Sequence, residues 1–257
     1  MLFRNYILII LSLLFIVSCK TLPKGVSPHM ATWLYGEHTI PAVATQSGSP
    51  ESFTPILNKG VSQKKIKNLV KPNVKVPAVV YLHGCRGITS ESDNYKNLFI
   101  NKGYAVFMPD SFARPERVNL CGSGDMYLRV PGRQREADTA LKEIRKLLWV
   151  DQKNVFLVGF NEGGHTAASW YNDKFTAVIA VGMSCVNSGG SPSVPDNVPI
   201  LTIIGQFDDF RSGESCKVER TIGGSKSVVI KDANHRVSLL EETEEAIDEF
   251  LKNCCGL

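Results

Sequence analysis

Residues 155–164, VFLVGFNEGG, have the form of a turn that exposes a nucleophile, but an amide stands at its tip. A buried strand followed by G-x-S-x-G places serine on a sharp strand-to-helix turn, where a histidine can remove its proton. Here Gly159 and Gly163 are in place, and Asn161 takes the serine position. Asparagine tolerates positive φ well, so the turn can form. A carboxamide, however, offers no nucleophilic lone pair and no proton that imidazole can take.

An acid and a base follow at the ends of two later apolar runs. Asp208 comes three residues after Gly205, and Asp209 is the alternative acid. His235 follows the next apolar run. An acid that orients a histidine, which in turn activates a nucleophile, is the arrangement of acyl-transfer catalysis. The residues therefore predict a hydrolytic site whose attacking group has been replaced.

Elements able to position these groups alternate along the chain from residue 76 onward. Continuous apolar, β-branched runs predict buried strands at 76–84, 104–110, 154–160, 175–183, 198–205 and 226–231. Helices are predicted near 93–101, over 133–150, after Gly163 and over 239–252, and residues 111–132 are expected to form a long excursion over one face. The 133–150 helix would carry Ala137, Ala140, Leu141, Ile144 and Leu148 on one apolar stripe. This alternation predicts an α/β fold, a mostly parallel sheet with helices on both faces, with functional groups at the carboxyl ends of the strands.

The region from about Val76 to Leu251 resembles the dienelactone hydrolase family of the α/β-hydrolase superfamily. The segments that carry the resemblance are YLHGCRG, VFMPDSFARPER, VFLVGFNEGG, IIGQFDDF and KDANH. The resemblance implies the α/β-hydrolase fold, in which turn, acid and histidine occur in this chain order. It also implies hydrolysis of a small ester or lactone, with no cofactor. Scattered histidines and the lack of paired C-x-x-C motifs do not favour a metal site.

The family's site residues can be placed on this sequence one by one. The acid corresponds to Asp208, the base to His235, and the nucleophile, serine or cysteine in relatives, to Asn161. The N–H groups of Cys85 and Glu162 would form the oxyanion hole. The segment His83-Gly84 is expected to shape the loop that carries the Cys85 N–H.

Three arginines follow the first two predicted strands: Arg86, Arg114 and Arg117. Solvated surface arginines are the default interpretation, and contact with an anionic substrate is the alternative.

The N-terminus, MLFRNYILIILSLLFIVSCK, predicts a lipoprotein signal peptide over residues 1–18. The residues before Cys19, Ile-Val-Ser, resemble a bacterial lipobox, so Cys19 is expected to be acylated. The alternative is an ordinary signal peptide with an incidental cysteine. Lys20 favours sorting to the outer membrane. Residues 19–50 are expected to form a tether and 51–257 the hydrolase-like domain, anchored on the periplasmic side of the bacterial envelope.

Without Cys19 the chain has six cysteines, which an oxidising compartment would pair in one of 15 ways. Cys85 and Cys121 follow neighbouring strands, as do Cys185 and Cys216, and these two pairs are favoured. Cys254 and Cys255 are then either joined to each other or free.

Size and charge narrow the class of protein. The 257 residues, 43% hydrophobic and 21% charged, fit one globular domain. A net charge of +4 without a basic stripe does not favour nucleic acid as a partner, and nothing in the sequence indicates the oligomeric state.

Three functional hypotheses are compatible with Asn161. The protein is a pseudoenzyme that binds a ligand or partner in the inherited pocket; or it hydrolyses by another route, through water activated by His235 or through aspartate formed by deamidation of Asn161; or it is a purely structural lipoprotein.

Overall fold

The protein was analysed as a computed structural model that describes residues 22–55, 66, 68–119, 121, 128–183, 185, 190–209 and 216–257. The predicted signal peptide and Cys19 lie outside these residues. In the part of the chain that is described, no helix is both long enough and apolar enough to cross a membrane.

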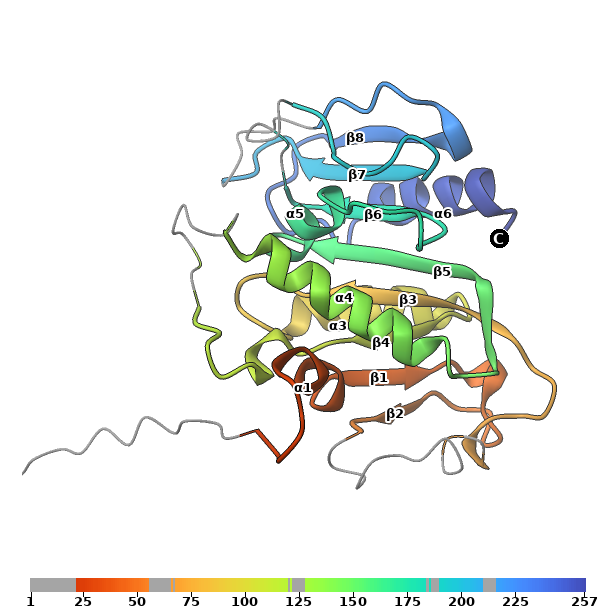
Figure 1. Ribbon diagram of the computed structural model, residues 1–257. Coiled ribbons are helices and arrows are strands. Elements are labelled where there is room, and N and C mark those ends of the chain that lie inside the picture. The colour runs from red at the N-terminus through yellow and green to blue at the C-terminus, as the bar shows by residue number, and fades with distance from the viewer. Residues whose placement is uncertain are drawn as a thin grey trace, which may run out of the picture.

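The described residues form one eight-stranded sheet in the order β2-β1-β4-β3-β5-β6-β7-β8 (Figure 1). The strands are β1 (Glu37–Ile40), β2 (Glu51–Phe53), β3 (Val76–Leu82), β4 (Ala105–Met108), β5 (Val150–Phe160), β6 (Val178–Val181), β7 (Ile200–Gly205) and β8 (Lys226–Ile230). The α-helices are α1 (Pro28–Leu34), α3 (Ser90–Asn101), α4 (Val130–Ile144), α5 (Glu162–Ala168) and α6 (Glu241–Cys255), and the 3-10 helices are η1 (Ala42–Ala44), η2 (Ser111–Ala113) and η5 (Ile222–Gly224).

Strands β3 to β8 run parallel, and β1 pairs antiparallel with both β2 and β4 at one edge. In the middle of the sheet Val79 of β3 lies opposite Val106 on one side and Phe156 on the other. Each is fully or almost fully buried, because helices cover both faces of the sheet. The predicted fold class, a mostly parallel sheet of the α/β-hydrolase type, is confirmed.

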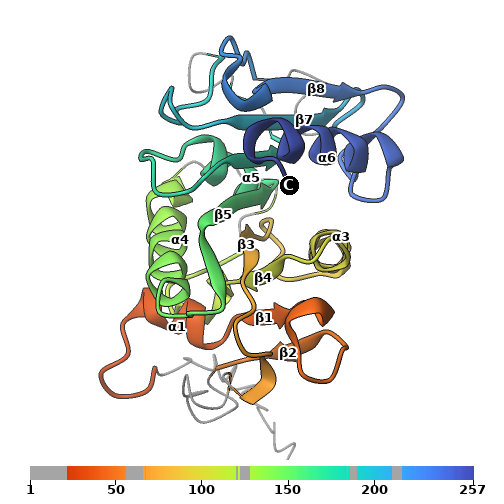
Figure 2. The same cartoon turned by 90° about the vertical axis from the view of Figure 1, so that its right-hand side faces the viewer.

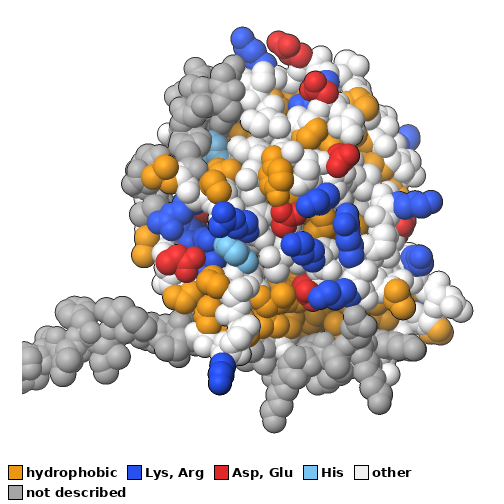
Figure 3. Space-filling model, in the orientation of Figure 1, with side chains coloured by type: hydrophobic (Ala, Val, Ile, Leu, Met, Phe, Trp, Pro, Cys, Tyr) orange, Lys and Arg blue, Asp and Glu red, His pale blue; other side chains and the backbone are white. Residues whose placement is uncertain are grey.

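The helices divide between the two faces, and each face has its own core (Figure 2). Helices α1, α4 and α5 cover one face, where Ala140 and Ile144 of α4 are fully buried. Helices α3 and α6 cover the other, through Phe99 and Phe250. The outer side of α4 faces solvent, and Lys and Arg side chains gather on this face of the molecule (Figure 3). Arg135 and Lys142 of α4 are exposed.

Two differences from the predicted boundaries change the description of the fold. Helix α1 and strand β1 lie inside residues 19–50, so this segment is not simply a tether. The strand is only four residues long and is flanked by turn-forming residues, which hid its pairing with β4. The helix predicted to reach residue 150 ends at Ile144, because β5 already begins at Val150. Leu148 therefore lies in the connecting turn, 87% exposed, and not on the apolar stripe.

Candidate active site

Asn161 sits at the tip of the turn between β5 and α5, with φ 55° and ψ −114°. The turn is sharp because its glycines allow strand and helix to approach closely. A Cβ on Gly163 would lie 1.9 Å from the carbonyl oxygen of Leu82, and one on Gly159 would lie 2.1 Å from that of Gly163. The predicted nucleophile turn is therefore formed, with an amide side chain at its tip.

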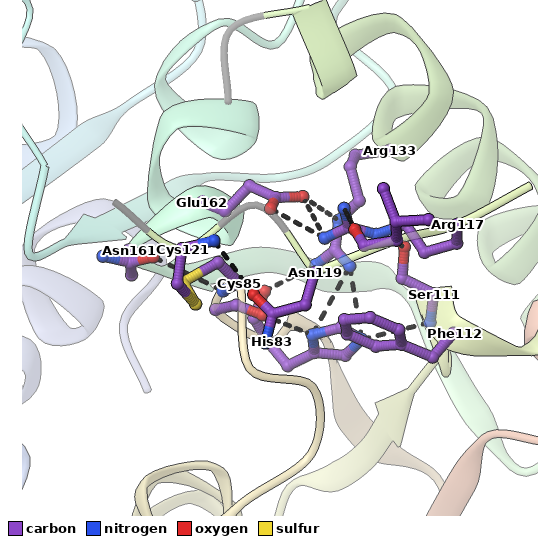
Figure 4. A network of polar contacts seen from close by, with 12 residues as sticks. His83, Cys85, Ser111, Phe112, Arg117, Asn119, Cys121, Arg133, Asn161 and Glu162 are labelled. Carbon is purple, nitrogen blue, oxygen red and sulfur yellow. Dashed lines mark hydrogen bonds and ion pairs between the residues drawn. A yellow bond between two sulfur atoms is a disulfide. The ribbon is translucent and has the colours of Figure 1, made fainter. Parts of the chain in front are cut away.

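The side chain of Asn161 contacts both predicted halves of the site. Its Oδ1 accepts a hydrogen bond from the Cys85 N–H over 3.4 Å (Figure 4). Its Nδ2 lies 2.9 Å from His235 Nε2. The other ring nitrogen, Nδ1, lies 2.7 Å from Asp208 Oδ2. With Nδ1–H donating to the carboxylate, Nε2 accepts from the Asn161 amide, so one tautomer satisfies every group in the chain of contacts.

Asp208 is the carboxylate that orients His235. It is 1% exposed, whereas the neighbouring Asp209 is exposed and lines the cavity beside the site. The structure thus resolves the choice between the two aspartates that the sequence left open.

Chemically, the amide imitates a serine hydroxyl in one respect only. Like a hydroxyl, its N–H donates to the histidine that would act as base. Unlike a hydroxyl, it leaves no oxygen that becomes nucleophilic when that proton is lost. Its own oxygen also occupies the Cys85 N–H, a donor that an oxyanion would need. Glu162, the second predicted donor through its N–H, is the first residue of α5 and follows the tip directly.

Behind the turn lies a buried ionic network that the sequence analysis did not identify (Figure 4). Arg117 Nη2 donates to both carboxylate oxygens of Glu162 at 2.7 Å, and both side chains are fully buried. Arg114 Nε lies 3.0 Å from Glu136 Oε1, and Arg133 lies 3.5 Å from the same carboxylate.

The interpretation of Arg114 and Arg117 as solvated or substrate-contacting residues was wrong. Each is 6% exposed and is held by the buried glutamates of the network. A signal was present in the sequence: Arg133 and Glu136 share the three- and four-residue spacing of the buried stripe on α4.

His83 links this network to the loop that carries Cys85. Its Nε2 accepts from the Ser111 N–H at 3.0 Å, and its Nδ1 lies 2.7 Å from the Gly84 carbonyl oxygen. Arg133 Nη2 donates to the His83 carbonyl at 2.7 Å. Burial, reinforced by the positive charge of Arg133, lowers the pKa of His83 well below its ordinary value, so the ring is neutral. His83 therefore shapes the oxyanion loop, as predicted.

Both favoured disulfides are present. Cys85 is joined to Cys121 and Cys185 to Cys216, and Cys254 is joined to its neighbour Cys255. The first disulfide fixes the loop that donates to Asn161 against the excursion between β4 and α4.

A cavity of about 330 Å³ opens beside Asn161 and His235. The ring of Phe160, 4.8 Å from that of His235 between centroids, forms part of its wall. Arg86 also lines the cavity and is exposed, so among the three arginines named from the sequence it is the one that faces this cavity. Within the described residues, no group of three or more His, Cys, Asp or Glu side chains is arranged to hold a metal ion.

A parallel sheet with a histidine, an aspartate and a sharp turn at its strand ends defines an α/β-hydrolase. The chain belongs to the Dienelactone hydrolase family, which it matches over residues 68–239. No curated protein matches it significantly.

Solved structures resemble this chain at low sequence identity. A candidate dienelactone hydrolase from Klebsiella pneumoniae superimposes with a TM-score of 0.51 and 16% identity, over 73% of this chain and 90% of that one. Esterase 2 from Thermogutta terrifontis gives a TM-score of 0.47 and 18% identity, over 73% and 86% of the two chains.

Proposed function

We propose that this protein is a membrane-anchored member of the Dienelactone hydrolase family whose inherited hydrolysis is lost or strongly reduced. It binds a small ester- or lactone-like ligand in the cavity beside Asn161. The observation that carries the proposal is the amide of Asn161, which stands at the nucleophile position between the Cys85 N–H and His235 Nε2. The anchor is part of the proposal and is supported by the lipobox-like sequence that ends at Cys19, which favours a lipid-tethered domain on the periplasmic side of the outer membrane.

The same contacts argue against the two alternative routes to hydrolysis. Water activation needs a free lone pair on His235 Nε2, and the Asn161 Nδ2–H already occupies it. Conversion to aspartate would have to proceed at an amide that is 5% exposed and is followed by Glu162, a bulky residue at the start of a helix. A purely structural role does not account for the cavity at the intact pair of His235 and Asp208.

Restoring the hydroxyl tests the proposal. Asn161→Ser is expected to raise the rate of p-nitrophenyl acetate hydrolysis by a factor on the order of 10³ or more, because removal of a serine nucleophile costs a related catalytic arrangement roughly 10⁶ in kcat. The wild type and the matched variant Asn161→Ala are expected to stay near the uncatalysed rate.

Peptide mass spectrometry of the wild type is the control for deamidation, and it should show residue 161 as unmodified asparagine. Ester turnover by the wild type that disappears in Asn161→Ala would overturn the proposal. Turnover that is unchanged in Asn161→Ala would also overturn it, and would identify a different nucleophile.

A further inference from the structure

One wall of the cavity carries a buried carboxylate that nothing in the site accounts for. Glu91 lies in the first turn of α3, lines the cavity and is 8% exposed. Its Oε1 is buried without a hydrogen-bond partner, and its side chain forms no ion pair with the described residues. Buried polar atoms are paired in the great majority of cases, so an unpaired carboxylate oxygen beside a cavity is a candidate contact for a ligand.

The surroundings of Glu91 repeat the same feature. The hydroxyl of Tyr95 is also buried without a partner, and its ring is stacked on that of Tyr81 with centroids 5.5 Å apart. Burial, with the charge of Glu91 adding to it, raises the pKa of the Tyr95 phenol well above its ordinary value. Tyr95 in turn packs against Phe160, which lines the cavity together with Glu91 and His235. The wall therefore offers a carboxylate acceptor next to aromatic rings.

The remaining charges of the cavity lie at exposed positions. Arg86 and Arg236 line it, as does Asp209, and neither arginine forms an ion pair with the described residues. The lining thus combines a buried negative group with two open guanidinium groups. A ligand that satisfies both must carry a hydrogen-bond donor of positive charge and an anionic group.

We propose that the cavity binds a small zwitterion, whose ammonium group docks on Glu91 and whose carboxylate faces Arg86 and Arg236. An amino acid or a short peptide derivative has this chemistry, and an aromatic side chain would pack on Phe160. The assignment rests on the proposed function in one respect, since it requires the cavity beside Asn161 to be a binding site, and it goes beyond it by naming a zwitterion, in place of an ester or lactone, as the ligand.

Three probes, each with a phenyl ring, separate the contributions of the ammonium and carboxylate groups to binding. They are L-phenylalanine, 3-phenylpropanoate, which lacks the ammonium, and 2-phenylethylamine, which lacks the carboxylate. Binding is followed by NMR titration of the intact domain with its disulfides. L-Phenylalanine is expected to bind best. Glu91→Gln should weaken L-phenylalanine and the amine roughly tenfold and leave 3-phenylpropanoate unchanged. Arg236→Gln should weaken the two carboxylates and spare the amine.

A second measurement needs no ligand. Glu91→Gln removes the carboxylate whose Oε1 is buried without a partner, so the Tm of the ligand-free protein should rise by about 2–4 °C relative to a matched control. That control is Glu241→Gln, which changes an exposed glutamate in the first turn of α6 and so reports the helix-terminus contribution alone.

The assignment is wrong if neither amine-bearing probe binds, if Glu91→Gln leaves their Kd unchanged, or if this variant melts below the Glu241→Gln control, as a structural glutamate would. None of these measurements contains an ester. Hydrolysis by the wild type would therefore contradict the proposed function and leave the ammonium site standing.

Discussion

Asn161 and Glu162 are neighbours in the chain, but their side chains serve opposite sides of the turn. Asn161 faces the cavity and lies between the Cys85 N–H and His235. Glu162 points away from it into the ionic network, where Arg117 binds both of its oxygens. On the buried side the arginines and glutamates form ion pairs, and on the cavity side Asn161, His235 and Asp208 form an unbroken chain of contacts with an amide at the tip of the turn. If the proposed function is correct, the comparison teaches that a nucleophile can be replaced while the surrounding geometry is kept.

The largest effect is expected on the hydrolysis rate of the Asn161→Ser variant, in which a hydroxyl takes the position that faces His235. In the Asn161→Ser background, Asp208→Asn is expected to lower kcat by about 10⁴, because the histidine then loses the partner that fixes its tautomer. The matched change Asp209→Asn, at the exposed neighbour, should have little effect on the hydrolysis rate. Equal losses in the two variants would mean that the pairing of His235 with Asp208 does not operate in the folded protein.

A smaller but substantial effect is expected on the buried side. Glu162→Gln leaves Arg117 buried without its counter-charge and should lower the free energy of unfolding by about 3–5 kcal/mol in urea denaturation. Replacing both partners, as in Arg117→Met with Glu162→Leu, should recover much of this loss.

The control for that measurement is Glu244→Gln, which breaks the exposed ion pair with Lys102 and should cost no more than about 1 kcal/mol. If Glu162→Gln were as mild as Glu244→Gln, the network would not stabilise the turn.

The smallest expected effect is the pH dependence of the free energy of unfolding that the buried histidines cause. Burial lowers the pKa of His38 to about 4, whereas the unfolded chain titrates near the ordinary value of 6.5. Between these values the unfolded chain binds more protons, so the free energy of unfolding should fall by about 3 kcal/mol as the pH drops from 6.5 to 4, with no contribution from His38 above 6.5.

His38→Gln removes this group, and the remaining slope of stability against pH should then include His83 and His29, whose pKa values burial lowers in the same direction. Identical slopes for the wild type and His38→Gln, measured by urea denaturation across this pH range, would contradict the assignment.

Much of this architecture could be predicted because the core strands are continuous apolar runs and the site residues follow their carboxyl ends. The turn at Asn161, the base His235 and the two longer-range disulfides were accessible for this reason. The partner of His235 was not, since Asp208 and Asp209 differ only in where the backbone points them. Nor was the burial of Arg114 and Arg117, because a charged residue is buried only when its counter-charge is brought close by the fold, and Glu136 and Glu162 are distant in sequence.

The disulfide between Cys85 and Cys121 has a practical consequence for anyone who prepares this protein. It holds the loop whose Cys85 N–H donates to Asn161, so protein produced in a reducing cytosol would lack this covalent link on one side of the cavity. Secretion into an oxidising compartment, followed by a thiol count, should precede any comparison of variants.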